Sequence, residues 1–302
     1  MKIEKGKLIE RINRFKCKVN IRGKEELVYL ANSGRLEELI KEGKEVILIE
    51  NKGKLPYKLI GVKKDKIWIS LDSHFVNKFF EREIINNIIP FLKNWKIENK
   101  EKKMNGSRID FVLRKGNIKM FCEIKSCTLV INNIALFPDA PTLRGIRHLE
   151  NLIENKRKGN ESSIIFIVQR EDAKSFAPNS FTHLDFSKIL YKAMLEGVNV
   201  YLITTKFNPY KISLKGVFYK KLDIFEILKN EYHLWRYPEV FINKFKKEKN
   251  KIYIEMRGTT CYHCSFEENL FDFIEFAKER GLDLKLDNII SEPGKVKAKI
   301  FI

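Results

Sequence analysis

The sequence predicts a mixed α/β protein built from a small β-barrel, an α/β domain and a short α+β extension. Three observations lead to this fold class. Short strand patterns broken by glycines and charged turns fill roughly the first seventy residues, helical and buried-strand patterns alternate through the middle of the chain, and a helical pattern lies between strand patterns in the tail. We expect the three parts to span residues 1–75, 76–229 and 230–302.

The first part contains about five strand patterns and one helical turn, at Gly34–Lys41. This many short strands within roughly sixty residues indicate a small closed barrel of the OB type. Such barrels often bind single-stranded nucleic acid, but they also serve as scaffolds without a ligand. The expected strands are Arg14–Ile21, Glu26–Leu30, Glu45–Ile49, Tyr57–Val62 and Lys66–Leu71.

The middle part begins with a helix from Asn77, which we expect to end at Pro90 because proline interrupts helical hydrogen bonding. Continuous apolar runs further on are typical of buried parallel strands. The order of elements is that of a sheet enclosed by helices, which is also the order of the restriction-endonuclease-like core. After a hairpin within residues 107–125, the expected elements are a helix at Thr142–Lys156, a strand at Ser162–Val168, a helix at Phe186–Leu195 and a strand at Val198–Thr204.

The tail is predicted to form a strand at Lys251–Arg257, an amphipathic helix at Glu267–Arg280 and a final strand at Lys295–Ile302. Between the first strand and the helix, Cys261 and Cys264 have CxxC spacing, which suits half a zinc site or a redox pair. No second CxxC or HxxxH follows, so a closed four-ligand zinc site lacks ligands within this sequence. The odd total of five cysteines favours reduced thiols.

The hairpin of the middle part places three charged side chains close together. Two strand patterns of period two, the pattern of half-buried strands, are separated by Gly116–Asn117, a pair suited to a type II′ turn. With this turn Asp110 lies opposite Glu123, about 4.5–5.5 Å away, and Lys125 follows on the same face. Two carboxylates this close repel each other unless a proton or a cation lies between them.

Two interpretations of this trio are open. Asp110, Glu123 and Lys125 can form a solvated face on which the lysine neutralises the acids. They also match the active-site pattern of the PD-(D/E)xK nucleases, in which Asp and Glu hold Mg²⁺ and Lys activates the attacking water. We therefore predict Asp110 and Glu123 as metal ligands, all three residues as catalytic, and Mg²⁺ or Mn²⁺ as the cofactor.

The net charge of +19 favours a polyanionic partner, with nucleic acid ahead of an anionic membrane surface. A proteome-wide bias toward lysine, from AT-rich coding or high growth temperature, is the alternative. No run approaches 18 apolar residues, and the first residues lack the apolar core of a signal peptide. We therefore expect a cytoplasmic protein without a membrane partner.

Several motifs in one order resemble the sugar fermentation stimulation protein A (SfsA) family over roughly residues 10–225. The most specific is the segment Phe137–Leu149, which is close to the family's Phe-Pro-Asp-Ala-Val-Thr-x-Arg-Gly-x-Lys-His-Leu. The tail beyond about residue 230 has no counterpart in the family pattern. The other matching segments are Arg14–Phe15, Ala31–Gly34, Leu55–Tyr57, Asn77–Phe79, Ser107–Phe111 and Glu123–Leu129.

The resemblance implies an OB-fold amino-terminal domain, a nuclease-like second domain and DNA binding, with the form of DNA and the oligomeric state left open. In the helix of the specific motif, Asp139 or Thr142 is expected to cap the amino terminus. Leu143 and Ile146 are expected to face inward, with Arg144 and His148 on the opposite face, where they would hold a phosphate. The residues predicted to contact nucleic acid are Arg108, Arg144, Arg147, His148, Asn32 and Arg35.

The predicted function is thus that of a DNA-binding protein with a metal-dependent nuclease site. A non-catalytic DNA-binding regulator of sugar metabolism genes is the alternative. The intact Asp-Glu-Lys set favours the enzyme, and the name of the family favours the regulator.

Overall fold

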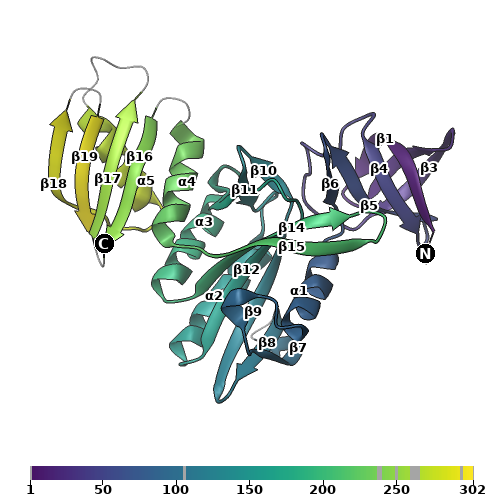
Figure 1. Ribbon diagram of the computed structural model, residues 1–302, viewed down its shortest axis with the longest axis horizontal. Helices are drawn as coiled ribbons and strands as arrows, with labels where there is room; N and C mark the ends of the chain where they lie inside the picture. Colours follow the sequence, from purple (N-terminus) through teal and green to yellow (C-terminus); the bar gives the residue numbers. More distant parts are fainter. Residues whose placement is uncertain are drawn as a thin grey trace.

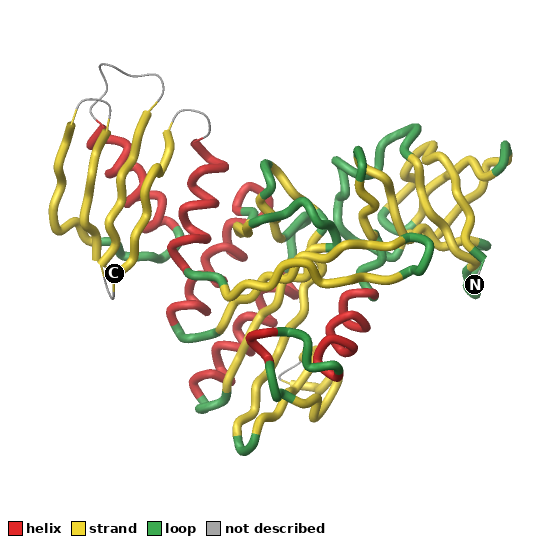
Figure 2. Tube along the Cα trace, in the orientation of Figure 1, coloured by secondary structure: helices red, strands yellow, loops and turns green. Residues whose placement is uncertain are grey.

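A computed structural model places the three parts of the chain in a row, in the order in which they follow one another in the sequence (Figure 1). The structure describes residues 2–104, 107–236, 240–248, 251–258, 266–292 and 295–301. The barrel with the amino terminus lies at one end, the sheet with the carboxyl terminus lies at the other, and the larger α/β unit lies between them (Figures 1 and 2).

The amino-terminal part is a closed barrel, as predicted. Its strands follow the order β3-β2-β1-β4-β5-β6, and a parallel pairing of β3 with β5 closes it. The prediction missed β1, in which only Glu4 and Leu8 are buried and apolar periodicity is weak. The strands are β1 (Ile3–Asn13), β2 (Lys16–Ile21), β3 (Lys24–Leu30), β4 (Glu45–Glu50), β5 (Tyr57–Lys64) and β6 (Ile67–Ser70).

The central part is a six-stranded sheet in the order β15-β14-β12-β9-β8-β7, in which β9, β12 and β14 are parallel neighbours. A smaller sheet, β10-β11-β13, lies beside it. The elements are α1 (Phe75–Ile85), η1 (Pro90–Leu92), β7 (Lys96–Met104), β8 (Ser107–Lys115), β9 (Ile118–Cys127), β10 (Leu129–Ile131), β11 (Ile134–Phe137), α2 (Leu143–Arg157), β12 (Glu161–Val168), β13 (Ser175–Pro178), α3 (Ser180–Leu195), β14 (Asn199–Asn208), β15 (Ser213–Lys221) and α4 (Ile224–Arg236).

The prediction for the central part missed β7, β10, β11, β13, β15 and α4, and two of its details are wrong. Helix α1 ends at Ile85 rather than at Pro90, because Asn87 adopts a left-handed φ of 56° and Pro90 begins the short helix η1. Strand β9 is not half-buried, because it lies inside the sheet with helices on both faces. Phe121 belongs to the core that contains Leu149 of α2, whereas Cys122 belongs to the core on the α1 side.

The carboxyl-terminal part is an antiparallel sheet in the order β16-β17-β19-β18, covered on one face by helices. The predicted strands β17 and β19 and the helix α5 are confirmed, whereas β16 and β18 were missed. Helix α4 runs through the expected boundary between residues 229 and 230, and Cys261 and Cys264 lie outside the described residues. The elements are β16 (Val240–Glu248), β17 (Lys251–Gly258), α5 (Phe266–Glu279), β18 (Lys285–Glu292) and β19 (Lys295–Phe301).

Within the described part of the chain, no helix combines the length and the apolar character needed to cross a membrane.

Candidate active site

The β8–β9 hairpin brings Asp110, Glu123 and Lys125 together as predicted. Gly116 has a φ of 58°, as the first turn residue of a type II′ hairpin requires, and the strands pair from Lys115 with Ile118 to Phe111 with Cys122. Asp110 and Glu123 are the next residues of their strands. The Oδ2 atom of Asp110 accepts a hydrogen bond of 2.9 Å from the backbone N–H of Ile124, and this bond orients the carboxylate.

Glu123 is the most deeply buried member of the trio, with 2% of its surface exposed. Its Oε1 atom accepts a hydrogen bond of 2.6 Å from Lys125 Nζ and is also bonded to Nδ1 of His148. Its Oε2 atom is buried and has no hydrogen-bond partner among the described residues. A buried carboxylate oxygen without a partner is costly, so this atom is suited to a ligand that supplies positive charge.

The hydrogen bonds of His148 determine its tautomer. Nε2 accepts a bond of 3.2 Å from Arg144 Nε, so the proton of a neutral ring must be on Nδ1, where it is donated to Glu123. Lys125 Nζ lies 3.1 Å from the same Nδ1. Because that nitrogen carries a proton and cannot accept, the ammonium group donates its hydrogen bond to Glu123. His148 thus links the exposed Arg144 to the buried carboxylate.

The pKa values of the two acids are shifted in opposite directions because their surroundings differ. Burial, followed by the charge of Glu123, raises the pKa of Asp110 to about 6. Burial also acts to raise the pKa of Glu123, but Lys125 and His148 outweigh it and lower this pKa. A pair of neighbouring carboxylates with divergent pKa values is typical of functional sites.

Helix α2 presents His148 to the strand rather than to solvent. Thr142 caps the helix, since its Oγ1 accepts a bond of 2.9 Å from Gly145 N–H. Leu143 is 69% exposed and His148 is 2% exposed, so the predicted placement of these two residues is wrong, whereas Ile146 packs against the core and Arg144 is exposed as expected. The buried arc runs through Gly145, His148, Leu149 and Leu152. A Cβ atom on Gly145 would lie 2.8 Å from Thr142 Cγ2 and 3.2 Å from Phe186, which shows how closely the helix packs.

The other predicted nucleic-acid contacts fall into two groups. Arg108, Arg144 and Arg147 are exposed, on β8 and on α2 beside the trio. Asn32 is buried in the barrel, where its Nδ2 donates to the carbonyl of Leu71, whereas Arg35 is exposed three residues later.

A hydrogen bond from helix α1 to the trio was not predicted from the sequence. Asn77 of α1 donates a bond of 3.3 Å to Oδ1 of Asp110. The resemblance to the SfsA family included Asn77 as a matching residue, and that match was the available signal.

A cavity of about 200 Å³ lies between the barrel and the central part of the chain. Barrel residues, among them Arg14 and Ser73, line one side, and Ser126, directly after Lys125, lines the other. Asp139 bridges the two parts near this cavity, because its Oδ2 accepts a bond of 2.9 Å from the backbone N–H of Leu36.

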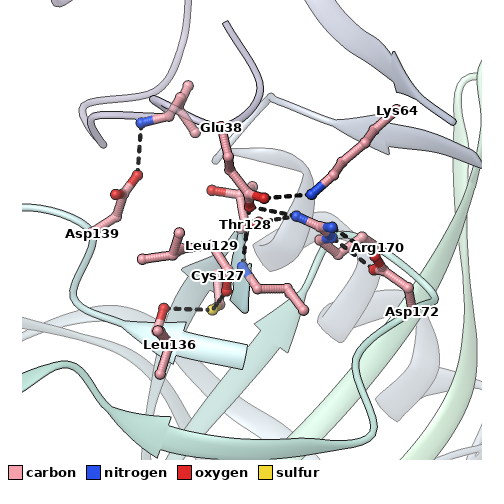
Figure 3. Close-up of polar contacts among 11 residues, drawn as sticks. Glu38, Lys64, Cys127, Thr128, Leu129, Leu136, Asp139, Arg170 and Asp172 are labelled. Atoms are coloured by element: carbon pink, nitrogen blue, oxygen red, sulfur yellow. Dashed lines mark hydrogen bonds and ion pairs between the residues drawn. The ribbon is translucent and has the colours of Figure 1, made fainter. Parts of the chain in front are cut away.

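A buried arginine holds the barrel to the central sheet (Figure 3). Arg170 is 1% exposed; it bonds Glu38 of the barrel at 2.5 Å and both carboxylate oxygens of Asp172, at 2.7 and 2.6 Å. Lys64 of β5 also reaches Glu38, at 2.6 Å. Charge-assisted bonds of this kind fix orientation as well as contact, so the barrel has a defined position relative to the trio.

Comparison with known proteins agrees with this architecture. The family model described as the SfsA N-terminal OB domain matches residues 9–71, and the sugar fermentation stimulation protein RE domain matches residues 74–211. A sugar fermentation stimulation protein homolog from Caldanaerobacter subterraneus subsp. tengcongensis is 39% identical over 217 residues, which cover 71% of this chain and 95% of the relative.

The chain belongs to the SfsA family.

Other SfsA proteins support the assignment. The homolog from Methanothermobacter thermautotrophicus is 38% identical over 209 residues, covering 68% of this chain and 87% of its own. The solved structure of Pyrococcus furiosus SfsA in complex with Ca²⁺ is 26% identical, with a TM-score of 0.66, and covers 73% of this chain and 95% of that one. The SfsA family models end at residue 211, before α4 and the carboxyl-terminal sheet.

Proposed function

We propose that this SfsA protein is a DNA-binding, metal-dependent nuclease whose catalytic residues are Asp110, Glu123 and Lys125. The observation that carries the proposal is the buried Oε2 atom of Glu123, which has no hydrogen-bond partner among the described residues and lies in a pair of neighbouring carboxylates. The net charge of +19 and the exposed arginines beside the trio support a DNA partner. We expect such an enzyme to work in the cytoplasm.

The residues fit a divalent cation. Asp110 and Glu123 supply hard oxygen donors, which Mg²⁺, Mn²⁺ and Ca²⁺ prefer. The solved Pyrococcus furiosus SfsA contains Ca²⁺, which supports the same class of cation here. When bound, the cation would neutralise charge on the phosphate and lower the pKa of a water.

The side chains around the carboxylates have separate roles in this proposal. Lys125 stabilises negative charge that develops on the phosphate, a role that its 2.6 Å bond to the proposed metal ligand Glu123 supports. His148 is a positioning residue, because it holds Oε1 of Glu123 and directs Oε2 away from itself. Asn77 and the Ile124 N–H orient Asp110. Arg144 and Arg147 would contact the phosphate backbone from α2.

Cleavage by a lysine variant tests the proposal. With Mg²⁺ or Mn²⁺, the wild type should cleave single-stranded, duplex or branched DNA, and Lys125→Ala should lower the rate by about 10²–10³-fold. DNA affinity should stay within about threefold, since Lys125 acts on the transition state. Lys119→Ala is the matched control, because Lys119 lies on the same strand with its side chain 37% exposed.

Metal binding gives a second readout. Calorimetry with Mn²⁺ should show heat with the wild type and none with Asp110→Asn, because the variant removes one of the two charged donors. Equal heats in both proteins would remove Asp110 from the metal site.

A non-catalytic DNA-binding regulator of sugar metabolism genes is the second candidate. One observation favours it: Lys125 and His148 already compensate Glu123 without a metal. A protein that binds DNA but cleaves none of the three substrates with either metal would make the regulator the better account.

A further inference from the structure

Among the described residues, helices cover one face of the four-stranded sheet at the carboxyl terminus and leave the other uncovered. Alternate residues of β17 and β19, among them Ile254 and Ala298, are buried in one core with Phe273 of α5. The residues between them point to the opposite face. Figures 1 and 2 show α5 behind the sheet, so the uncovered face is the one toward the viewer.

The uncovered face carries lysines around a tyrosine. Tyr253, on the interior strand β17, is 38% exposed. Its direct neighbours on the adjacent strands are Lys246 of β16 and Lys299 of β19. Two residues further along, Lys244 and Lys297 flank Glu255 in the same way. These four lysines and Tyr253 line a groove of about 570 Å³.

A second ring and two carboxylates complete this surface. The ring of Phe301 lies 5.3 Å from Lys251 Nζ and 5.7 Å from Lys299 Nζ. Glu255 is paired with Arg257 at 3.1 Å and with Lys244 at 3.5 Å, and Asp287 is paired with Lys299 at 2.6 Å. The four lysines and Arg257 outnumber these two acids, so the surface keeps an excess of positive charge.

This combination fits an unpaired nucleic acid strand. Lysines attract the phosphates, and an exposed aromatic ring stacks on a base, which it can do only when the base is unpaired. A duplex would instead require an element that enters a groove. Four strands about 4.8 Å apart make a face roughly 14 Å wide, enough for two or three bases.

We propose that the open face of β16–β19 binds single-stranded DNA, with Tyr253 stacking on a base and the surrounding lysines holding phosphates. The choice of DNA over RNA rests on the proposed function, whereas the preference for a single strand rests on this surface alone. The site lies outside the segments matched by the SfsA family models and is separate from the Asp110–Glu123 pair.

Removal of the ring tests the stacking. Full-length protein is titrated in EDTA, which prevents metal-dependent cleavage, with a short fluorescent oligo(dT) read by anisotropy. Tyr253→Ala should weaken binding by about 5- to 150-fold, the range of base–aromatic stacking, and Tyr253→Phe should stay within about twofold. Phe271→Ala is the matched control, because this ring is 53% exposed on α5, the helix on the opposite face; its affinity should equal that of the wild type.

Removal of charge tests the role of the lysines. Lys244→Ala/Lys246→Ala should reduce the slope of log K against log[salt] by about 1.4, or roughly 0.7 for each phosphate that is no longer neutralised. Lys278→Ala on α5, with its side chain 68% exposed, should leave the slope unchanged. An oligo(dT) that carries 4-thiothymidine should crosslink to peptides of β17 or β19.

Several outcomes would overturn the proposal. The first is wild-type affinity for oligo(dT) in both Tyr253→Ala and the double lysine variant. The second is a set of crosslinks confined to residues outside 240–301. The third is Tyr253-dependent binding that is tighter for oligo(rU), duplex DNA or anionic vesicles than for oligo(dT). None of these measurements requires cleavage, so a failure of the nuclease proposal would be seen separately, in Lys125→Ala.

Discussion

At the scale of single residues, the carboxylate of Glu123 lies in unfavourable surroundings. One of its oxygens is bonded to both Lys125 and His148, and the other is buried without a partner among the described residues. Asp110 is held nearby with a raised pKa. Carboxylates in such unfavourable surroundings are more common at functional sites than at positions that serve stability alone.

The raised pKa of Asp110 predicts how stability depends on pH. Its carboxyl titrates near 3.8 when unperturbed and at about 6 in the folded protein. Between these values the folded state binds more protons than the unfolded state, so stability falls as pH rises through this window and stays lower above it. Asp110→Asn, measured in EDTA, should therefore raise the free energy of unfolding by about 2–3 kcal/mol at pH near 7.5 and change it little at pH near 4.

Urea denaturation at the two pH values checks this expectation, with Asp283→Asn as a control at an exposed position. An equal gain at both pH values would show that the charge of Asp110 is not the cause.

At the scale of elements, strand β14 connects the central sheet to the barrel. Its residue Phe207 packs so closely on β5 that a Cβ atom at Gly61 would lie 2.7 Å from the phenyl Cε1 and 3.3 Å from the carbonyl of Ile69. Arg170 fixes the same two parts by ion pairs with Glu38 and Asp172. The position of the barrel beside the trio therefore depends on both packing and charge.

Gly61→Ala should destabilise the protein by about 1–3 kcal/mol, because the added methyl group overpacks this region. Phe207→Leu, which removes part of the ring, should recover much of the stability when combined with Gly61→Ala. Thermal unfolding of both variants measures the effect. Gly53→Ala is the control, since the nearest atom there is the terminal amide nitrogen of Asn51, 3.1 Å away, rather than a ring or a backbone atom. No recovery in the double variant would show that packing against β14 is not the cause.

At the scale of the whole molecule, a buried network joins the carboxyl-terminal sheet to the central part. Arg280, directly after α5, bonds Glu231 of α4 at 2.8 Å and Ser180 of α3 at 3.1 Å. Tyr191 of α3 donates to the other oxygen of Glu231 at 2.6 Å. One apolar core continues from the central sheet through these helices to β17 and β19. The sheet that carries the proposed DNA surface is thus packed directly against the central part.

Arg280→Ala should cost about 3–5 kcal/mol, because it leaves Glu231 buried without its cation. Adding Glu231→Gln should restore part of this stability, since the uncompensated charge is then absent. Chemical denaturation of the two variants provides the values. Arg157→Ala, at an arginine with a 58% exposed side chain, should change stability by at most about 1 kcal/mol. An effect of Arg280→Ala as small as that of the control would exclude the network as a major source of stability.

Local rules account for much of what could be predicted. A two-residue turn at Gly116–Asn117 sets the register of its hairpin, and the register alone brings Asp110 and Glu123 together. The helix of the family motif begins where a threonine can cap it. The strands found in the two open sheets, β8, β9, β12, β14, β17 and β19, are interior strands, whose apolar side chains leave a clear pattern.

The strands that were missed in those sheets, β7, β15, β16 and β18, are the four edges. An edge strand has a neighbouring strand on one side only, and it often carries charged residues and a short apolar pattern. Such a strand is therefore recognised only when its pairing in the assembled sheet is known. The same limit applies to His148 and Asn77. The contact of His148 with β9 depends on which face of α2 packs against the sheet, and the contact of Asn77 with Asp110 depends on where α1 packs. The sequence by itself therefore determined the trio and its family, and tertiary packing decided the partners that set its charge.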